Sequence, residues 1–281
     1  FSSRRRHTRF RNVTGVQTCA LPICKVEGVV HGHLSPDAAI AAARAIAGKI
    51  GAKPAPESAL LRRRHLAIAA KEDVVDAGLV AGVNSAFIRD YLLPDDSPAT
   101  RAAAVVLANF FGEPFYTELR TKQQLGYIVG SNAGASLRQR YFSFVVQSSG
   151  YAPDELRKRA EAFIAGIPAL LAAVDDKQWA TLIAGARSTL EEKPKSIREK
   201  ADQFFAGAFS YGGEWDRRQS AVKALESLTK EKAAALLTKA FAADTAQRRT
   251  VMLHSKNHAP AEPITPTFTD RNAWKATRKF D

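Results

Sequence analysis

Apolar residues recur at intervals of three and four along several stretches of the chain, the spacing that buries one face of a helix. The clearest stretch begins at Pro153 and predicts a helix to about Leu171, which Pro168 should kink or split. Similar patterns predict helices over 37–50 and 230–241. A further helix is expected from residue 98, interrupted at Gly112 and restarted at Pro114 through residue 124.

Short polar motifs mark where these helices begin. Ser35-Pro36-Asp37 combines a capping hydroxyl, a proline in the first turn and an acid that favours the helix dipole. Two capping-box spacings, in which an N-cap side chain is followed three residues later by Glu or Gln, predict two more helix starts. They are Asp175 with Gln178 and Ser196 with Glu199.

Alternating segments predict the strands. Residues 25–34 read as one strand, and 62–70 with 76–84 as a hairpin around a charged turn. A second pair of strands is expected over 126–134 and 140–149, and a last strand over 248–255. Strand pairs followed by helix pairs favour an α+β fold, with an antiparallel sheet and helices packed on one face.

The first part of the chain differs from the rest. Residues 1–23 have no apolar periodicity, contain five arginines and no acid, and resemble the translation of sequencing-library adapters. We therefore interpret 1–24 as an adapter-derived, non-biological segment and expect the natural polypeptide to continue upstream. Residues 51–58, rich in Gly, Pro and Ser, read as a linker. The predicted division is then 25–57, the tail of a preceding domain, and 58–281, a C-terminal domain.

Setting the first segment aside changes the charge and the cysteine content. The formal net charge of +13 falls to about +8 once five arginines are removed. Cys19 lies in that segment and Cys24 at its junction, so disulfide frameworks and cysteine-based zinc sites are excluded. No apolar run reaches the roughly 20 residues of a membrane span.

Common catalytic motifs are absent from the sequence, which contains no HxxEH, HExxH, GxSxG, GxGxxG or Walker-type loop. His31 and His33, two apart, could share a strand face and seat a metal, but no third ligand accompanies them, and an ordinary exposed pair is favoured. His65, His254 and His258 show no partner spacing.

Basic clusters occur at 62–64, 138–140, 157–159 and 248–249. A nucleic-acid-binding surface would place them on one face among aromatic side chains. They fall instead at strand starts and on the polar side of a helix, so a solvated face is favoured.

The segment ELRTKQQLGY, residues 118–127, brings together two hydrogen-bond donors. Arg120 is predicted in the last turns of a helix and Tyr127 at the start of the next strand, with Gly126 allowing the reversal between them. A guanidinium and a phenol suit a peptide carbonyl, especially one acquiring negative charge. Spacing alone also fits an ordinary helix-end arginine and a tyrosine at a sheet edge. Gln123 and Gln124 are expected to hold the helix end.

The central segment FYTELRTKQQLGYIVGSNAG resembles the F-x-x-LRTKEQLGYIV segment in the C-terminal half of pitrilysin and insulysin-type zinc metallopeptidases, the inverzincins. VVHGHLSPDAAIAAARAI is similar to the strand and helix that close the family's third domain. The stretches EEKPKSIREKADQFFAGAFSYGGEWDR and LESLTKEKAAALLTKAFA resemble its late helices. The resemblance spans about residues 25–260.

That resemblance implies a peptidase of four homologous α+β domains in two halves that close around a peptide. Zinc would be bound by HxxEH and a downstream glutamate in the N-terminal half, which is missing here. This chain would supply no metal ligand, and alone it is predicted to be inactive. Its implied site residues are Arg120, which fixes the substrate backbone, and Tyr127, which is catalytic through its hydroxyl and also contacts substrate. The partners implied are a peptide substrate and the N-terminal half of the same polypeptide.

Two other functions remain open. The chain could belong to an inactive peptidase-like partner or structural subunit, since zinc-free members exist in this superfamily. A basic nucleic-acid-binding domain is permitted by the charge and disfavoured by the pattern, so neither nucleic acid nor membrane is expected as a partner. The periplasm is favoured over the cytoplasm as the compartment.

Overall fold

The computed structural model describes residues 28–50, 56, 64–258, 260 and 265–280. The chain divides into two compact units, Phe1–Arg64 with Pro194–Gly213, and His65–Lys193 with Glu214–Asp281. The predicted boundary between 57 and 58, and the adapter-like segment 1–24, lie outside the described residues. The linear division into 25–57 and 58–281 therefore stays a prediction.

The larger unit is built on a five-stranded sheet with strand order β1-β5-β2-β4-β3. The strands are β1 (Asp73–Val80), β2 (Ser85–Leu92), β3 (Ile128–Ser136), β4 (Gln139–Ser148) and β5 (Arg248–Ser255). Neighbouring strands are antiparallel except for β1 and β5, which run parallel. The mixed α+β architecture predicted from the sequence is confirmed, with one parallel pair at its edge.

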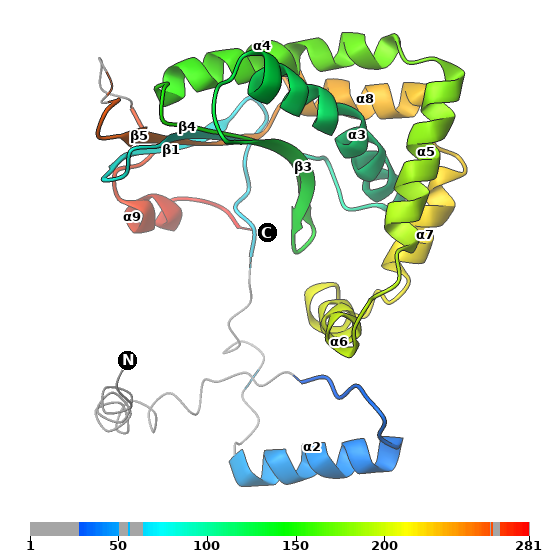
Figure 1. The fold of residues 1–281 in the computed structure, drawn as a ribbon. Helices are drawn as coiled ribbons and strands as arrows, with labels where there is room; N and C mark the ends of the chain where they lie inside the picture. Colours follow the sequence, from blue (N-terminus) through cyan, green and yellow to red (C-terminus); the bar gives the residue numbers. More distant parts are fainter. Residues whose placement is uncertain (1–27, 51–55, 57–63, 259, 261–264, 281) are drawn as a thin grey trace. The chain divides into compact units, whose positions relative to one another are not determined.

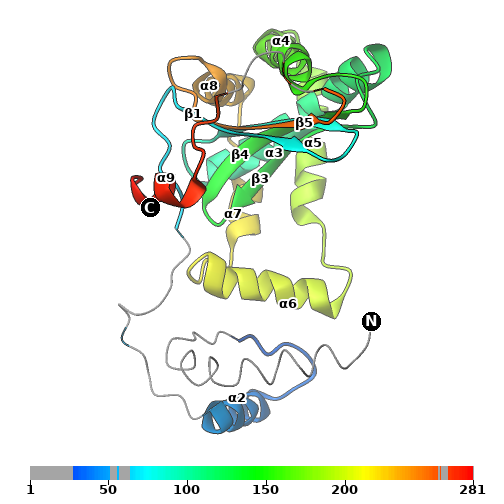
Figure 2. The same ribbon diagram turned by 90° about the vertical axis from the view of Figure 1, so that its left-hand side faces the viewer.

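Helices cover one face of this sheet. Figure 1 shows α3 (Pro98–Tyr116), α4 (Pro153–Ala172) and α8 (Lys230–Phe241) on the same side, and Figure 2 shows α4 and α8 there with the sheet nearly edge-on. α5 (Asp176–Glu191) and α7 (Arg217–Leu225) pack against α3 through Ala102, Val106, Ala186 and Leu225. The main core lies between sheet and helices and includes Phe87, Phe111, Phe115, Phe142, Phe144, Leu156, Ile167 and Leu237.

The C-terminal segment covers part of the opposite face. Its short helix α9 (Arg271–Ala276) lies across the sheet from α4 (Figure 1) and carries Trp274, which stacks on Phe268 with ring centroids 4.8 Å apart. Both rings pack against Ile68, Val74 and Leu92. Further along, Phe280 bridges to Leu66.

The smaller unit contains α2 (Pro36–Ile50), α6 (Ile197–Phe205) and the π-helix η4 (Ala206–Ser210). Within it, the rings of His31 and Phe204 lie 5.1 Å apart. None of the residues of α2 is buried, and Ile40, Ile46 and Ile50 remain exposed.

Helix starts were predicted well because capping is local. The Ser35 hydroxyl accepts from the Ala38 N–H at 3.2 Å, and Ser97 caps α3 in the same way. The Asp175 capping box is complete, and Ser196 caps α6. A side chain that bonds a backbone N–H three residues ahead needs nothing from the rest of the chain.

The predicted interruption of the helix between Gly112 and Pro114 is wrong, and so is the predicted split of the later helix at Pro168. α3 runs through Gly112 and Pro114 without interruption, and α4 is one 20-residue helix through Pro168. In both helices the flanking apolar residues are buried in the core, including Phe111, Phe115, Ile167 and Leu171. This packing offsets the hydrogen bond that each proline removes.

The first predicted strand and the first predicted hairpin are also wrong. Residues 28–34, the described part of the first, form no strand, because alternation gives a strand only where another strand supplies hydrogen bonds. For the hairpin, residues 64–70 contribute a single bridge, and β1 pairs with distant β5 rather than with a neighbour in sequence.

Strand β2 was not indicated by the pattern. A charged residue, Arg89, occupies one of its buried positions at 1% exposure and breaks the apolar alternation. The guanidinium is compensated by Asp73 at 3.2 Å and Glu161 at 2.8 Å. Only the folded structure brings these carboxylates to it, so sequence reasoning had no signal for this strand.

Candidate functional site

The candidate site lies where α3 ends and β3 begins. After Tyr116 the helix widens into a π-helix, η3 (Thr117–Lys122), in which Gln123 N–H donates to the Glu118 carbonyl oxygen at 3.0 Å. Leu119 and Leu125, on either side of the turn, are fully buried in the main core. Arg120 therefore stands on a helix end that is anchored from the protein interior.

The reversal into β3 uses two residues in different ways. Gln124 has a left-handed backbone with φ of 52°. Gly126 does not need positive φ, contrary to the expected reason for a glycine at this position. It is required because a Cβ there would lie 1.8 Å from the Gln147 carbonyl oxygen on β4. The close approach fixes the chain immediately before Tyr127.

Arg120 and Tyr127 meet at this junction. The Arg120 guanidinium carbon lies over the Tyr127 ring, 5.4 Å from its centroid. Tyr127 is 85% exposed, unusual for a large aromatic residue next to a core. The stacking orients the guanidinium, and the phenol hydroxyl is available to solvent.

Arg120 differs from most arginines of the larger unit. Arg89, Arg101, Arg140, Arg217 and Arg249 all pair with carboxylates. No carboxylate pairs with Arg120 within the described residues, and its Nε is buried without a hydrogen-bond partner there. A cation held on an exposed ring without an anion is suited to receive an acceptor group from another molecule.

The other sequence candidates do not form a site. His31 and His33 are exposed, and no group of three His, Cys, Asp or Glu side chains in the described residues could hold a metal. Two of the described basic clusters are paired with carboxylates, Arg157 with Glu161, Arg159 with Glu155 and Arg140 with Asp96, whereas residues 62 and 63 of the first cluster lie outside the described residues.

His254 and His258 come together although their spacing gave no signal. His258 Nδ1 lies 3.2 Å from the Ser255 hydroxyl and 3.4 Å from that of Ser85, and His254 Nδ1 lies 3.1 Å from the His258 carbonyl oxygen. This cluster ties the end of β5 to the start of β2, a structural role.

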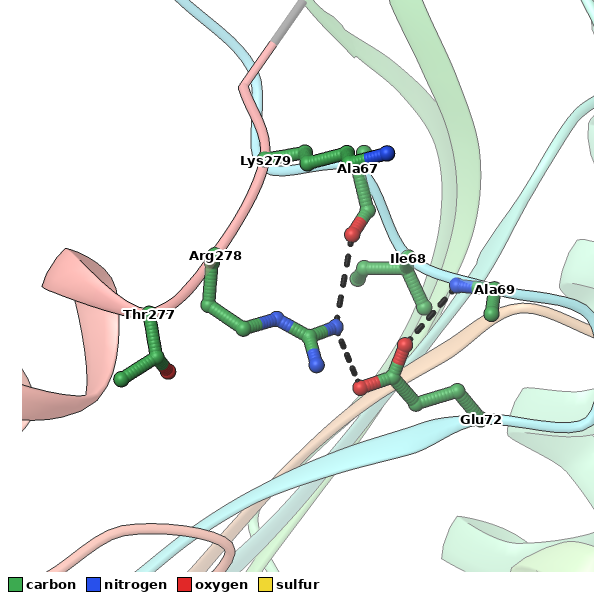
Figure 3. A pocket seen from close by; sticks show the side chains of 7 residues that line it. All are labelled: Ala67, Ile68, Ala69, Glu72, Thr277, Arg278 and Lys279. Atoms are coloured by element: carbon green, nitrogen blue, oxygen red, sulfur yellow. Dashed lines mark hydrogen bonds and ion pairs between the residues drawn. The ribbon is translucent and has the colours of Figure 1, made fainter.

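A pocket of about 330 Å³ lies elsewhere, between the C-terminal segment and residues 67–72 (Figure 3). Arg278 bridges the Glu72 carboxylate and the Ala67 carbonyl oxygen across it. The Arg278 guanidinium is thus already paired inside the pocket, in contrast to that of Arg120.

Comparison with known proteins finds a family match that includes the candidate site. A family model described as PQQ synthase PqqF-like, C-terminal lobe domain 4, matches residues 106–205, which contain both Arg120 and Tyr127. The chain is related to the C-terminal half of the pitrilysin-type peptidases. The resemblance noted in the sequence is thereby confirmed.

Individual relatives agree with this pitrilysin-type assignment. A nardilysin-like protein of Arabidopsis thaliana is 29% identical over 196 residues, 64% of this chain and 18% of the relative. Human insulin-degrading enzyme is 24% identical over 234 residues, 82% of this chain and 23% of the enzyme. The crystal structure of pitrilysin superposes with a TM-score of 0.78 at 21% identity, covering 89% of this chain and 27% of that one.

The chain spans about a fifth of the length of these curated relatives. Its fold and its pitrilysin-type relationship follow from the comparisons. Within the described residues, no helix combines the length and apolar character that a membrane crossing requires.

Proposed function

We propose that this chain is the non-zinc-binding C-terminal half of a zinc metalloendopeptidase. In this proposal it closes the substrate chamber, and Arg120 and Tyr127 bind the substrate carbonyl near the scissile bond. The observation that carries the proposal is the Arg120 guanidinium stacked on an exposed Tyr127 without a carboxylate partner in the described residues.

The two side chains would act in different ways. A guanidinium presents several N–H donors in a rigid plane, so Arg120 would fix a backbone carbonyl of the bound peptide. The Tyr127 hydroxyl would donate to the carbonyl oxygen on which negative charge develops. A donor of this kind lowers the barrier by about 2.7–4 kcal/mol.

Zinc would not be held by this chain. The described residues do not fit a zinc site, because they bring no three ligating side chains together. The proposal assigns the metal to the N-terminal half of the same polypeptide, where it supplies the nucleophile for peptide hydrolysis. The 281-residue chain alone would then bind peptide weakly and hydrolyse none.

The test uses the complete polypeptide encoded at the same locus and a fluorogenic peptide substrate. Tyr127→Phe should lower kcat at least tenfold and leave folding intact. Arg120→Lys should also lower kcat/KM, because an ammonium cannot reproduce the planar fork. Tyr116→Phe, a half-exposed tyrosine four residues before Arg120, is the matched control and should behave as wild type. Wild-type turnover in Tyr127→Phe would remove the proposed role.

The competing proposal, an inactive peptidase-like partner subunit, makes a different prediction. The complete polypeptide would then lack HxxEH upstream and hydrolyse no peptide. Sequencing the locus upstream separates the two. The periplasmic location stays a prediction.

A further inference from the structure

The π-helical turn at the end of α3 places Arg120. Two backbone hydrogen bonds wider than those of an α-helix close this turn. The Gln123 N–H donates to the Glu118 carbonyl oxygen five residues earlier, and the Leu125 N–H donates to the Leu119 carbonyl oxygen six residues earlier, both at 3.0 Å. Such turns are rare and are often found at functional sites. A π-helical turn holds one residue more than an α-helical turn. Without that extra residue, the side chains that follow would be rotated once by about 100°, the angle between successive residues of an α-helix.

A set of side chains spans this turn on its solvent side. The Glu118 carboxylate accepts from Gln123 Nε2 at 3.1 Å and pairs with Lys122 Nζ at 3.1 Å. We call these three residues the Glu118 clasp. The hydrogen bond from Gln123, followed by that from Lys122, lowers the pKa of Glu118 below its ordinary value. Glu118 is therefore held as a carboxylate, which accepts the hydrogen bond from Gln123 and pairs with Lys122.

The turn is thus held from two sides. Leu119 and Leu125 fix it from the core, and the Glu118 clasp joins its first residues to its last. Arg120 lies in sequence between Glu118 and the other two clasp residues. Its side chain donates no hydrogen bond to the described residues and forms no ion pair with them. Its position over Tyr127 depends on the shape of this turn.

We propose that Glu118 and Gln123 are positioning residues, which hold the π-helical turn so that the guanidinium of Arg120 lies on the ring of Tyr127. This inference rests on the proposed function of that pair. In this proposal Glu118 and Gln123 affect turnover only through the position of Arg120 and do not touch the substrate.

The kinetic test compares clasp variants in the complete polypeptide. Gln123→Ala and Glu118→Ala should each lower kcat/KM about tenfold, since misplacement by 1 Å can cost up to about a hundredfold. Glu118→Gln keeps an acceptor for Gln123 and should stay within about twofold of wild type. Glu191→Ala removes an exposed pair with Arg187 on α5 at 3.3 Å and serves as the matched control, with no change expected.

A second measurement, by NMR, tests the position of Arg120 over the Tyr127 ring and does not depend on catalysis. In the 281-residue chain, the Arg120 Hε resonance should be shifted upfield by the ring current of Tyr127, and Tyr127→Leu supplies the unshifted reference. Gln123→Ala should move the resonance towards that reference, whereas Glu118→Gln should not.

The outcomes separate the two proposals. If Tyr127→Phe is impaired while Gln123→Ala keeps both wild-type kcat/KM and the wild-type Arg120 resonance, the clasp inference is wrong and the proposed function stands. If Tyr127→Phe turns over normally, the proposed function fails. In that case the chemical shift of Arg120 Hε in Gln123→Ala still shows whether the clasp positions Arg120.

Discussion

Gly126→Ala should damage both the stability of the sheet and the candidate site. The added methyl carbon would stand 1.8 Å from the Gln147 carbonyl oxygen and 2.8 Å from its carbonyl carbon. Cβ atoms in proteins keep at least 3.0 Å from such neighbours, so the segment that leads into β3 must move away from β4 by more than 1 Å. The obstacle is backbone within the sheet and cannot rotate away as a side chain would.

The size of the effect follows from this displacement. Overpacking of a well-packed region costs about 1–3 kcal/mol, and we expect the free energy of unfolding to fall by that amount. Gly126 directly precedes Tyr127, so the hydroxyl should move by a similar distance. Misplacement by about 1 Å can reduce turnover about a hundredfold.

Gly130→Ala, on the strand β3 that follows Gly126, is the matched control. A Cβ at Gly130 meets no atom within 4 Å, so stability should change by less than about 0.5 kcal/mol. Urea unfolding of the 281-residue chain measures stability, and kcat/KM of the complete polypeptide measures the site. If Gly126→Ala and Gly130→Ala behave alike in both assays, the argument from close approach is refuted.

Two further predictions concern ion pairing and capping. Burial raises the pKa of Glu214, but hydrogen bonds from Arg101 and Arg217 outweigh it and lower this pKa to about 2. A lowered pKa stabilises the fold above the ordinary value of 4.5, and this contribution is lost as the pH falls towards 2. Glu214→Gln should therefore lower the free energy of unfolding at pH 7, as measured by urea unfolding. The difference in this free energy between the variant and wild type should become smaller below pH 4.5. A difference that stays the same at all pH values would contradict the pairing. Asp175→Ala removes the cap of α5 and should cost about 0.5–2 kcal/mol by the same assay, whereas an unchanged midpoint would show that the capping box contributes nothing.

The candidate site could be predicted in part. The sequence placed Arg120 near a helix end and Tyr127 at a strand start, and it indicated donors suited to a carbonyl. It did not predict the π-helical turn, because that turn depends on Leu119 and Leu125 being buried together. It also gave the wrong reason for Gly126, since the nearby carbonyl of Gln147 belongs to another strand.

The sequence by itself determined what short-range interactions control. The starts of α2, α3, α5 and α6 follow from capping side chains, and α8 and β5 have the predicted bounds. The tertiary structure alone decided that β5 lies between β1 and β2, that Arg89 can be buried, and that Arg120 stacks on Tyr127. A cap bonds within three residues, whereas a strand chooses its partner, and a buried charge its counter-ion, only when distant segments pack together.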